Sequence, residues 1–351
     1  MDTLALTTRE ERELSTDLAE LGQAANEAAA QSAFADYRLR KATNTLRRQD
    51  ATLALFADYL GDVGGISPGG PALAGDPGAW AGVTWGLVEG FVKWLLLRGY
   101  AVGTVNVHLS TVKTYAKLAE KAGALDTQAV ALIRAVNGYS HKETPRVDEK
   151  RAAAGIPTRT GSKKREPVSL TPVQAAALKA QPDTPQGRRD RLLMCLLLEH
   201  GLRVGEVAGL TVTDVDLKRG ELRFYREKVN KTQTHKLTAD TWEAARVYLE
   251  CDASPIGLLI RSSRKDGSLT GAGMTSRAMT ARVGMLGAAL GVDGLSAHDC
   301  RHYWATQAAR SGTPVDRLMD AGGWESPAMP LRYVEAATIA NEGVKLEVGS
   351  E

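Results

Sequence analysis

A basic, proline-containing segment at residues 141–168 divides this chain into two patterned parts, and it constrains the possible fold more than any other feature. It carries eight Lys/Arg against four Asp/Glu, and its three prolines interrupt any continuous helix or strand. We predict an interdomain linker whose 28 residues would reach about 90 Å when extended, at ~3.3 Å per residue. Because the whole chain has 351 residues, each side of the linker can bury its own core.

The part before the linker has the apolar periodicity of helices. Residues 1–33 contain seven acidic residues and two arginines, with leucines at helical spacing, and predict an acidic helical extension. Residues 34–140 predict a small helical domain of about 100 residues. Its helices are expected at 34–60, 85–98 and 104–122, with a Gly- and Pro-rich loop at 61–79.

The part after the linker, residues 169–335, combines helical periodicity with one stretch of strand-like alternation. That stretch, at 212–238, predicts a small antiparallel sheet. A buried helix over 191–200 is expected to stop at Gly201. Further helices are expected near 240–250, 273–290, 299–311 and 314–321, followed by a C-terminal tail at 336–351. The predicted fold class is therefore mainly α with a small antiparallel β-sheet (α+β), in two domains.

Composition excludes several other classes of protein. Hydrophobic residues make up 43% of the chain and charged residues 24%, as in ordinary globular domains. No apolar run approaches the roughly 18 residues of a membrane span, and the N-terminus lacks the pattern of a secretory signal. Cys195, Cys251 and Cys300 are scattered without C-x-x-C spacing, which argues against disulfides and zinc. We therefore expect a cytoplasmic protein without a membrane partner.

Four residues, Arg203, His298, Arg301 and Tyr333, are together suited to attack on a phosphodiester. Its negative charge spreads over the oxygens in the transition state, so catalysis needs fixed positive donors, an acid and a nucleophile. Arginine supplies a planar fork of donors that stays protonated. His298 and Arg301 are three residues apart on an expected helix and therefore face the same side. Each residue alone is commonplace, so the prediction depends on their occurrence together.

Tyr333 is the expected nucleophile among nine tyrosines. It follows Gly322-Gly323-Trp324 and a segment that contains Pro327 and Pro330, whereas Tyr303 is expected to pack inside. Attack by a phenol forms a phosphotyrosyl ester that conserves the energy of the phosphodiester, so strands can be rejoined without ATP. No carboxylate cluster has metal-ligand spacing, and we expect neither a metal nor another cofactor.

Lys231 is the expected general acid, in the hairpin loop of residues 227–232, and Lys228 is the alternative. Taken alone, Lys231 would be a solvated hairpin lysine, Glu206 an exposed helix charge or a partner of Arg203, and Trp324 a core aromatic. Their order along the chain with the phosphate-binding candidates favours one shared site.

These residues resemble the tyrosine recombinase (phage integrase) family over about residues 35–335. Segments 201–210 and 295–302 resemble the family's two arginine-containing boxes, and 103–113 resembles its core-binding domain. The stretch 318–324, followed by Arg332-Tyr333, is most similar to the Cre branch, in which tryptophan replaces the commoner histidine. The hairpin departs from the pattern, because it reads Lys-Thr-Gln rather than the frequent Lys-Thr-Gly.

The resemblance implies a role for each position of the site and for the assembly. In the implied site, Arg203 and Arg301 clamp the scissile phosphate, and His298 assists proton transfer. Trp324 donates to a phosphate oxygen, and Glu206 supports the site. Lys231 is the general acid, and Tyr333 forms a 3′-phosphotyrosine. The family works as a homotetramer on two double-stranded DNA sites with inverted repeats, exchanging strands through a Holliday junction. The tail at 336–351 would dock on a neighbouring protomer, and the protein would associate with the nucleoid.

The expected architecture is a C-shaped clamp on DNA, formed by a core-binding domain, the basic linker and a catalytic domain. Its expected DNA contacts are Arg38, Arg40, Lys41, Arg47, Arg48, Lys113, Lys163, Lys164 and Arg165. The first 33 residues are too short and too acidic for a separate arm-site domain, which favours a simple recombinase. A type IB topoisomerase-like or hairpin-forming enzyme is a close alternative, and a catalytically silent DNA-binding protein is an alternative of another class.

Overall fold

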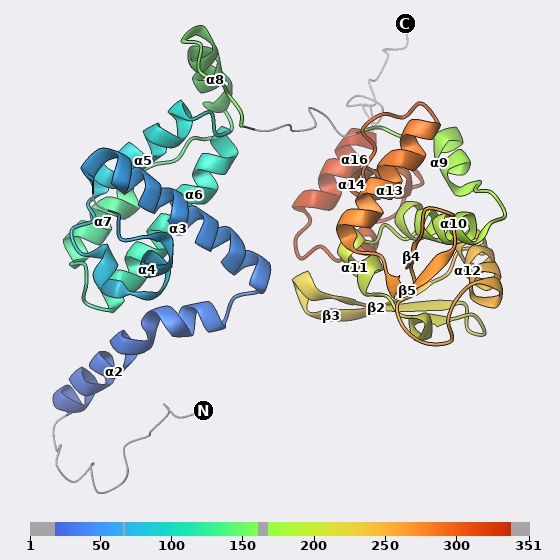
Figure 1. Ribbon diagram of the computed structural model, residues 1–351, viewed down its shortest axis with the longest axis horizontal. Coiled ribbons are helices and arrows are strands. Elements are labelled where there is room, and N and C mark those ends of the chain that lie inside the picture. The colour runs from blue at the N-terminus through green and yellow to red at the C-terminus, as the bar shows by residue number, and fades with distance from the viewer. Residues whose placement is uncertain (1–17, 66, 161–167, 338–351) are drawn as a thin grey trace, which may run out of the picture. The chain divides into compact units, whose positions relative to one another are not determined.

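The computed structural model describes residues 18–65, 67–160 and 168–337, and the chain divides into two compact units, Met1–Lys163 and Lys164–Glu351 (Figure 1). Each unit has a hydrophobic core of its own. The expected mainly α fold with small antiparallel sheets is confirmed. The C-shaped clamp and the domain limits stay predictions. None of the described helices is long and apolar enough to cross a membrane, and no described group of three or more His, Cys, Asp or Glu side chains is placed to hold a metal.

Unit 1 is a set of helices packed around an aromatic core. Phe56 lies between Trp80 and Phe91, with ring centroids 5.9 and 5.0 Å apart, and all three side chains are fully buried. Large aromatic rings bury more area than aliphatic side chains, so they dominate a core of this size. The helices are α2 (Leu18–Leu39), α3 (Thr43–Gly64), α4 (Gly70–Gly75), η1 (Pro77–Trp80), α5 (Trp85–Leu97), α6 (Val102–Lys121), α7 (Thr127–Ala135) and α8 (Thr144–Ala153).

Two helix predictions in unit 1 were wrong in detail. The expected break between residues 33 and 34 lies instead at residues 40–42, because α2 continues to Leu39 and α3 begins at Thr43. The expected loop at 61–79 contains α4 and η1, in which Pro71 and Pro77 occupy the first helical turns. A proline there loses no hydrogen bond, since the first backbone N–H groups of a helix have no partner within it. Residues 1–17 of the acidic extension lie outside the described residues.

The segment at 141–168 is not an extended linker over its first part. Residues Thr144–Ala153 form α8, which begins with Pro145 in its first turn. From this helix the buried Arg151 donates to the carbonyl oxygens of Leu96 (2.9 Å), Tyr100 (3.1 Å) and Pro157 (2.6 Å). One guanidinium thereby satisfies three backbone acceptors and fastens the segment to unit 1. Residues 161–167 lie outside the described residues, so the reach of about 90 Å no longer applies to the whole segment.

Unit 2 surrounds one buried helix, α10 (Pro185–Leu198), in which residues 192–198 are all buried. The expected antiparallel sheet is present in the order β1-β2-β3, with Arg226 opposite Lys231 at the hairpin end. A second sheet, β4-β5, was not predicted. The elements are α9 (Pro172–Lys179), α10, α11 (Val204–Gly209), η2 (Val212–Asp214), β1 (Val215–Asp216), β2 (Glu221–Arg226), η3 (Glu227–Val229), β3 (Lys231–Lys236), α12 (Ala239–Cys251), β4 (Arg261–Ser263), β5 (Leu269–Gly273), α13 (Ser276–Ala289), α14 (Ala297–Arg310), α15 (Val315–Gly322) and α16 (Ala328–Ala337).

Candidate active site

The C-terminal end of α15 gathers the predicted phosphate-binding residues. The helix stops at Gly323, whose φ of 59° lies in the left-handed region that favours glycine. Its last carbonyl oxygens have no partner within the helix. Arg301 donates to the oxygen of Gly322, and Arg203 donates to that of Gly323 at 3.3 Å. Two arginines 98 positions apart in sequence are thus brought to adjacent peptide groups.

Arg203 and Glu206 form a local unit at the start of α11. Arg203 is the N-cap residue, and its backbone N–H donates to Glu206 Oε2 at 2.8 Å while its Nη1 donates to Oε1 at 2.9 Å. The carboxylate therefore fixes both the turn and the guanidinium. Glu206 is buried, with its side chain 6% exposed, whereas the Arg203 side chain stays 27% exposed. Of the two default interpretations, Glu206 is the partner of Arg203 and not an exposed helix charge.

Arg301 and His298 both belong to α14, but their environments differ. Arg301 is buried and also donates to the carbonyl of Gly201, the residue at which the buried helix was expected to stop. His298, in the first turn, is exposed, and its ring lies 4.5 Å from that of His302. His302 in turn lies 5.2 Å from the ring of Tyr333. The predicted histidine thus reaches the predicted nucleophile through a second histidine.

Tyr333 lies on α16 and contacts aromatic side chains from outside that helix. Its ring centroid lies 5.7 Å from that of Trp324, and Tyr333 is 4% exposed. The Trp324 ring covers the guanidinium of Arg301, with the carbon of that group 4.4 Å from the ring centroid. A β-carbon on Gly322 would lie 1.9 Å from the Trp324 ring, so this position leaves no space for a side chain. Pro330 lies in the first turn of α16, where proline is tolerated.

The charge of the site is strongly positive. In the described part of the chain, the guanidiniums of Arg203, Arg226 and Arg301 surround one buried carboxylate, that of Glu206. Burial lowers the pKa of Arg301, and repulsion by Arg203 and Arg226 adds to this shift. Burial raises the pKa of the Tyr333 phenol, while Arg301 and Arg203 act in the opposite direction. A bound anion would relieve the repulsion among the guanidiniums.

The two candidate acids lie at the β2–β3 hairpin. Lys231 begins β3, and its ammonium donates to Asp320 Oδ1 on α15 at 2.8 Å. The two side chains are 57% and 68% exposed. Exposed ion pairs contribute about 0–1 kcal/mol to stability, so Lys231 can leave Asp320 at little cost. Lys228 lies in η3 at the turn. The choice between Lys231 and Lys228 stays a prediction.

Sequence reasoning missed Arg226, Gln233 and His302. Arg226 is fully buried at the end of β2, where it follows the inward-facing Leu222 and Phe224 in strict alternation. An arginine at an inward strand position is the signal that could have revealed it, because a buried charge requires partners. Gln233, which stands where the frequent pattern has glycine, accepts from Arg226 Nε and donates to the Asp320 carbonyl at 2.6 Å.

The expected DNA contacts of unit 1 have varied surroundings. Arg38 is ion-paired with Asp50 at 2.6 Å, whereas Arg40, Lys41, Arg47 and Arg48 are exposed. Residues Lys163, Lys164 and Arg165 lie outside the described residues.

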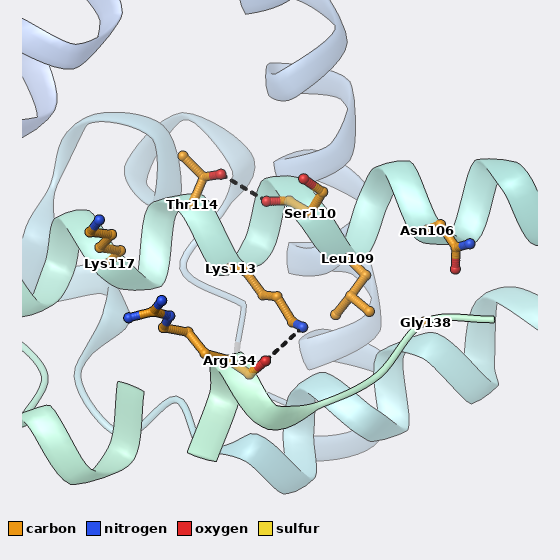
Figure 2. Close-up of a pocket in the computed structure, with 8 residues that line it drawn as sticks. All are labelled: Asn106, Leu109, Ser110, Lys113, Thr114, Lys117, Arg134 and Gly138. Atoms are coloured by element: carbon orange, nitrogen blue, oxygen red, sulfur yellow. Dashed lines mark hydrogen bonds between the residues drawn. The ribbon is translucent and has the colours of Figure 1, made fainter. Parts of the chain in front are cut away.

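Lys113 lies at a polar cavity of about 450 Å³ between α6 and α7, together with Lys117 and Arg134 (Figure 2). Its ammonium donates to the carbonyl of Arg134 at 2.9 Å and to that of Val136, which completes the end of α7. Burial lowers the pKa of Lys113. Contact of Lys113 with DNA stays a prediction.

The part of the chain that contains the gathered arginines, tryptophan and tyrosine is similar to a known protein family. Residues 169–338 match the phage integrase family. Several of the curated proteins to which this chain is similar are tyrosine recombinases. The closer likeness to the Cre branch stays a prediction.

Individual similar proteins are consistent with this match. The chain is 29% identical to tyrosine recombinase XerD of Neisseria meningitidis serogroup B over 189 residues, which are 52% of this chain and 64% of that protein. It is 27% identical to tyrosine recombinase XerC of Rhodospirillum centenum, over 84% of this chain and 77% of that one. The match with the Neisseria protein thus spans less than two thirds of its length. The Tn1549 transposon integrase in complex with transposon right end DNA has the same fold, with a TM-score of 0.59, 15% identity, and coverage of 87% of this chain and 94% of that chain.

Proposed function

We propose that this protein is a site-specific DNA recombinase that cuts and rejoins double-stranded DNA through a 3′-phosphotyrosine, without metal or ATP. The observation that carries the proposal is the convergence of Arg203, Arg301 and Trp324 on the same helix end as the buried phenol of Tyr333. An excess of guanidinium groups beside a potential nucleophile matches the needs of phosphoryl transfer. The match of residues 169–338 with the phage integrase family supports the same chemistry.

The proposed reaction proceeds by one exchange of ester bonds at phosphorus. Arg203 and Arg301 bind the nonbridging oxygens, and the Trp324 indole N–H donates to one of them. The Tyr333 phenol loses its proton with help from His298 and attacks the phosphorus. The bond to the 5′ oxygen breaks, and that oxygen takes a proton from Lys231 or Lys228 to leave as a hydroxyl.

The reverse step completes recombination. A 5′ hydroxyl from the exchanged strand attacks the phosphotyrosine, releases Tyr333 and restores a phosphodiester, so the number of high-energy bonds is unchanged. We propose a homotetramer on two inverted-repeat sites and a Holliday junction, with integration, excision or resolution as the outcome. Its place of action would be the nucleoid in the cytoplasm. The proposed docking tail is residues 336–351, of which 338–351 lie outside the described residues and the first two end α16.

A nicked suicide duplex, carrying the site selected from random DNA, tests the nucleophile. Cleavage near the nick lets the short leaving strand diffuse away, so a covalent protein–DNA adduct should accumulate. Tyr333→Phe should bind the duplex with unchanged affinity and form no adduct, because it lacks the attacking oxygen.

Tyr303→Phe is the matched control, since Tyr303 packs partly buried against the core of unit 2 and should retain adduct formation. An adduct that persists in Tyr333→Phe would rule out the assignment. Binding without adduct in the wild type would favour a silent DNA-binding protein. Relaxation of supercoiled DNA without recombinants would favour a topoisomerase.

A further inference from the structure

Arg226 is a fully buried arginine beside the candidate active site, at the last position of β2. Burial of a charged group is costly unless it is paired and hydrogen-bonded, so its partners require an explanation. Full burial also prevents direct contact with DNA. Burial lowers the pKa of the guanidinium, while Glu206 opposes that shift.

The partners of Arg226 are the same groups that hold the phosphate-binding arginines. Its Nη1 donates to both oxygens of Glu206, at 2.9 and 3.0 Å, and Glu206 also binds Arg203. The same Nη1 lies 3.2 Å from the carbonyl oxygen of Gly322, which also accepts from Arg301. Arg226 therefore shares one acceptor with each of the two arginines.

Two further contacts connect Arg226 to the helix end and to the hairpin. Its Nη2 donates to the carbonyl of Ala321 at 2.6 Å, and a β-carbon on Gly323 would lie 2.6 Å from its Cδ. Its Nε donates to Gln233, whose amide donates to the carbonyl of Asp320, the residue paired with Lys231. The contacts thus run from the hairpin lysine through α15 to both arginines.

We propose that Arg226 is a positioning residue that fixes the guanidiniums of Arg203 and Arg301 for the scissile phosphate. This inference rests on the proposed function and assigns a role that touches no substrate atom. Arg226 acts by holding Glu206 and the Gly322 peptide in place, so that the two arginines do not have to reorganise when the phosphate arrives. Preorganised donors of this kind supply much of the stabilisation of a charged transition state.

The test compares Arg226→Met on two nicked suicide duplexes, one with an ordinary scissile phosphate and one with a methylphosphonate there. A methylphosphonate is neutral and lacks one charged nonbridging oxygen, so its cleavage depends less on correctly placed arginines. Adduct formation by Arg226→Met should slow by about 100-fold on the ordinary duplex and by less than about 10-fold on the neutral one. The affinity for DNA should change by less than about 3-fold, because Arg226 does not contact it.

Arg189→Met is the matched control for loss of a buried arginine. Arg189 is 1% exposed on α10 and pairs with Asp190. Its removal should lower the stability of the protein, and adduct formation should slow equally on both duplexes or not at all. If Arg226→Met fails to fold, Gln233→Leu replaces it. That variant keeps Arg226 but removes its Nε partner, and we expect a loss of about 10-fold on the ordinary duplex alone.

The outcomes separate this inference from the proposed function. The positioning role would be overturned if adduct formation by Arg226→Met slowed equally on both duplexes, or if a folded variant kept the wild-type rates. In either case, adduct formation by the wild type would still support Tyr333 as the nucleophile. If the wild type forms no adduct on the ordinary duplex, the proposed function fails and this inference fails with it.

Discussion

At the scale of single residues, the site depends on backbone acceptors as much as on side chains. Arg301, Arg203 and Arg226 all donate to carbonyl oxygens at the end of α15. These hydrogen bonds depend on the backbone conformation at the end of α15 and not on the side chains there. The sequence predicted Arg203, Arg301, Trp324 and Tyr333 as site residues because their types and order suit one chemistry. It could not identify Arg226, because its burial follows from the register of β2 against β3.

The identity of the general acid is a question at this same scale. We predict that Lys231→Ala slows adduct formation on ordinary DNA by about 100-fold, within the usual range for loss of a general acid. Lys231→Ala should cleave a duplex with sulfur in place of the 5′ leaving oxygen at the wild-type rate, since a thiolate leaves without protonation. Single-turnover rates of both duplexes provide the measurement. Lys228→Ala is the control, and if it alone shows this pattern, the two lysines exchange roles.

At the scale of elements, the structure differs from expectation where a segment gains order from distant contacts. The composition of 144–153 indicated a linker, yet Arg151 turns it into a packed helix by binding three carbonyl oxygens outside α8. Local periodicity placed α5, α6, α12 and α14 to within a few residues. It could not reveal contacts that join segments more than 50 positions apart.

The packing of β3 against the core predicts an acid sensitivity of unit 2. His235 on β3 stacks on His200, at 5.7 Å, and burial lowers the pKa of each to about 4. In the unfolded chain both would titrate near the ordinary value of 6.5. The unfolded state therefore binds more protons between these values, and stability should fall as the pH drops from 6.5 to 4, by up to about 1.4 kcal/mol per pH unit for each histidine.

Urea unfolding followed by tryptophan fluorescence over this pH range would measure the effect. His235→Gln should reduce the slope, because it removes one of the two groups that stay neutral in the folded state. A slope unchanged in His235→Gln would show that other groups cause the acid sensitivity.

At the scale of the whole molecule, the net charge of +3 says little about the candidate site, where three guanidiniums lie near one buried carboxylate. The excess of guanidinium groups in unit 2 and the exposed Arg40, Arg47 and Arg48 in unit 1 both favour a polyanion. The net charge of the chain could not reveal these two positive regions, because acidic residues concentrated at the start of the chain offset them.

Binding to DNA should therefore depend steeply on salt. Neutralising phosphates releases counterions, so the affinity for the selected duplex should fall by about 1,000-fold between 50 and 200 mM salt if the protein makes at least six phosphate contacts. Fluorescence anisotropy at several salt concentrations measures the slope. The isolated mutation Arg203→Ala should lower that slope by about one contact. A flat response would contradict a DNA-encircling architecture.

The end of α15 has a consequence for how such a chain can vary. Because its peptide groups, and not its side chains, receive the arginines, substitutions on the exposed side of this helix are compatible with an intact site. Adding or deleting one residue before Gly322 would instead rotate every carbonyl by about 100° and detach all three guanidiniums at once. This segment should therefore tolerate substitutions on its exposed side but not insertions or deletions.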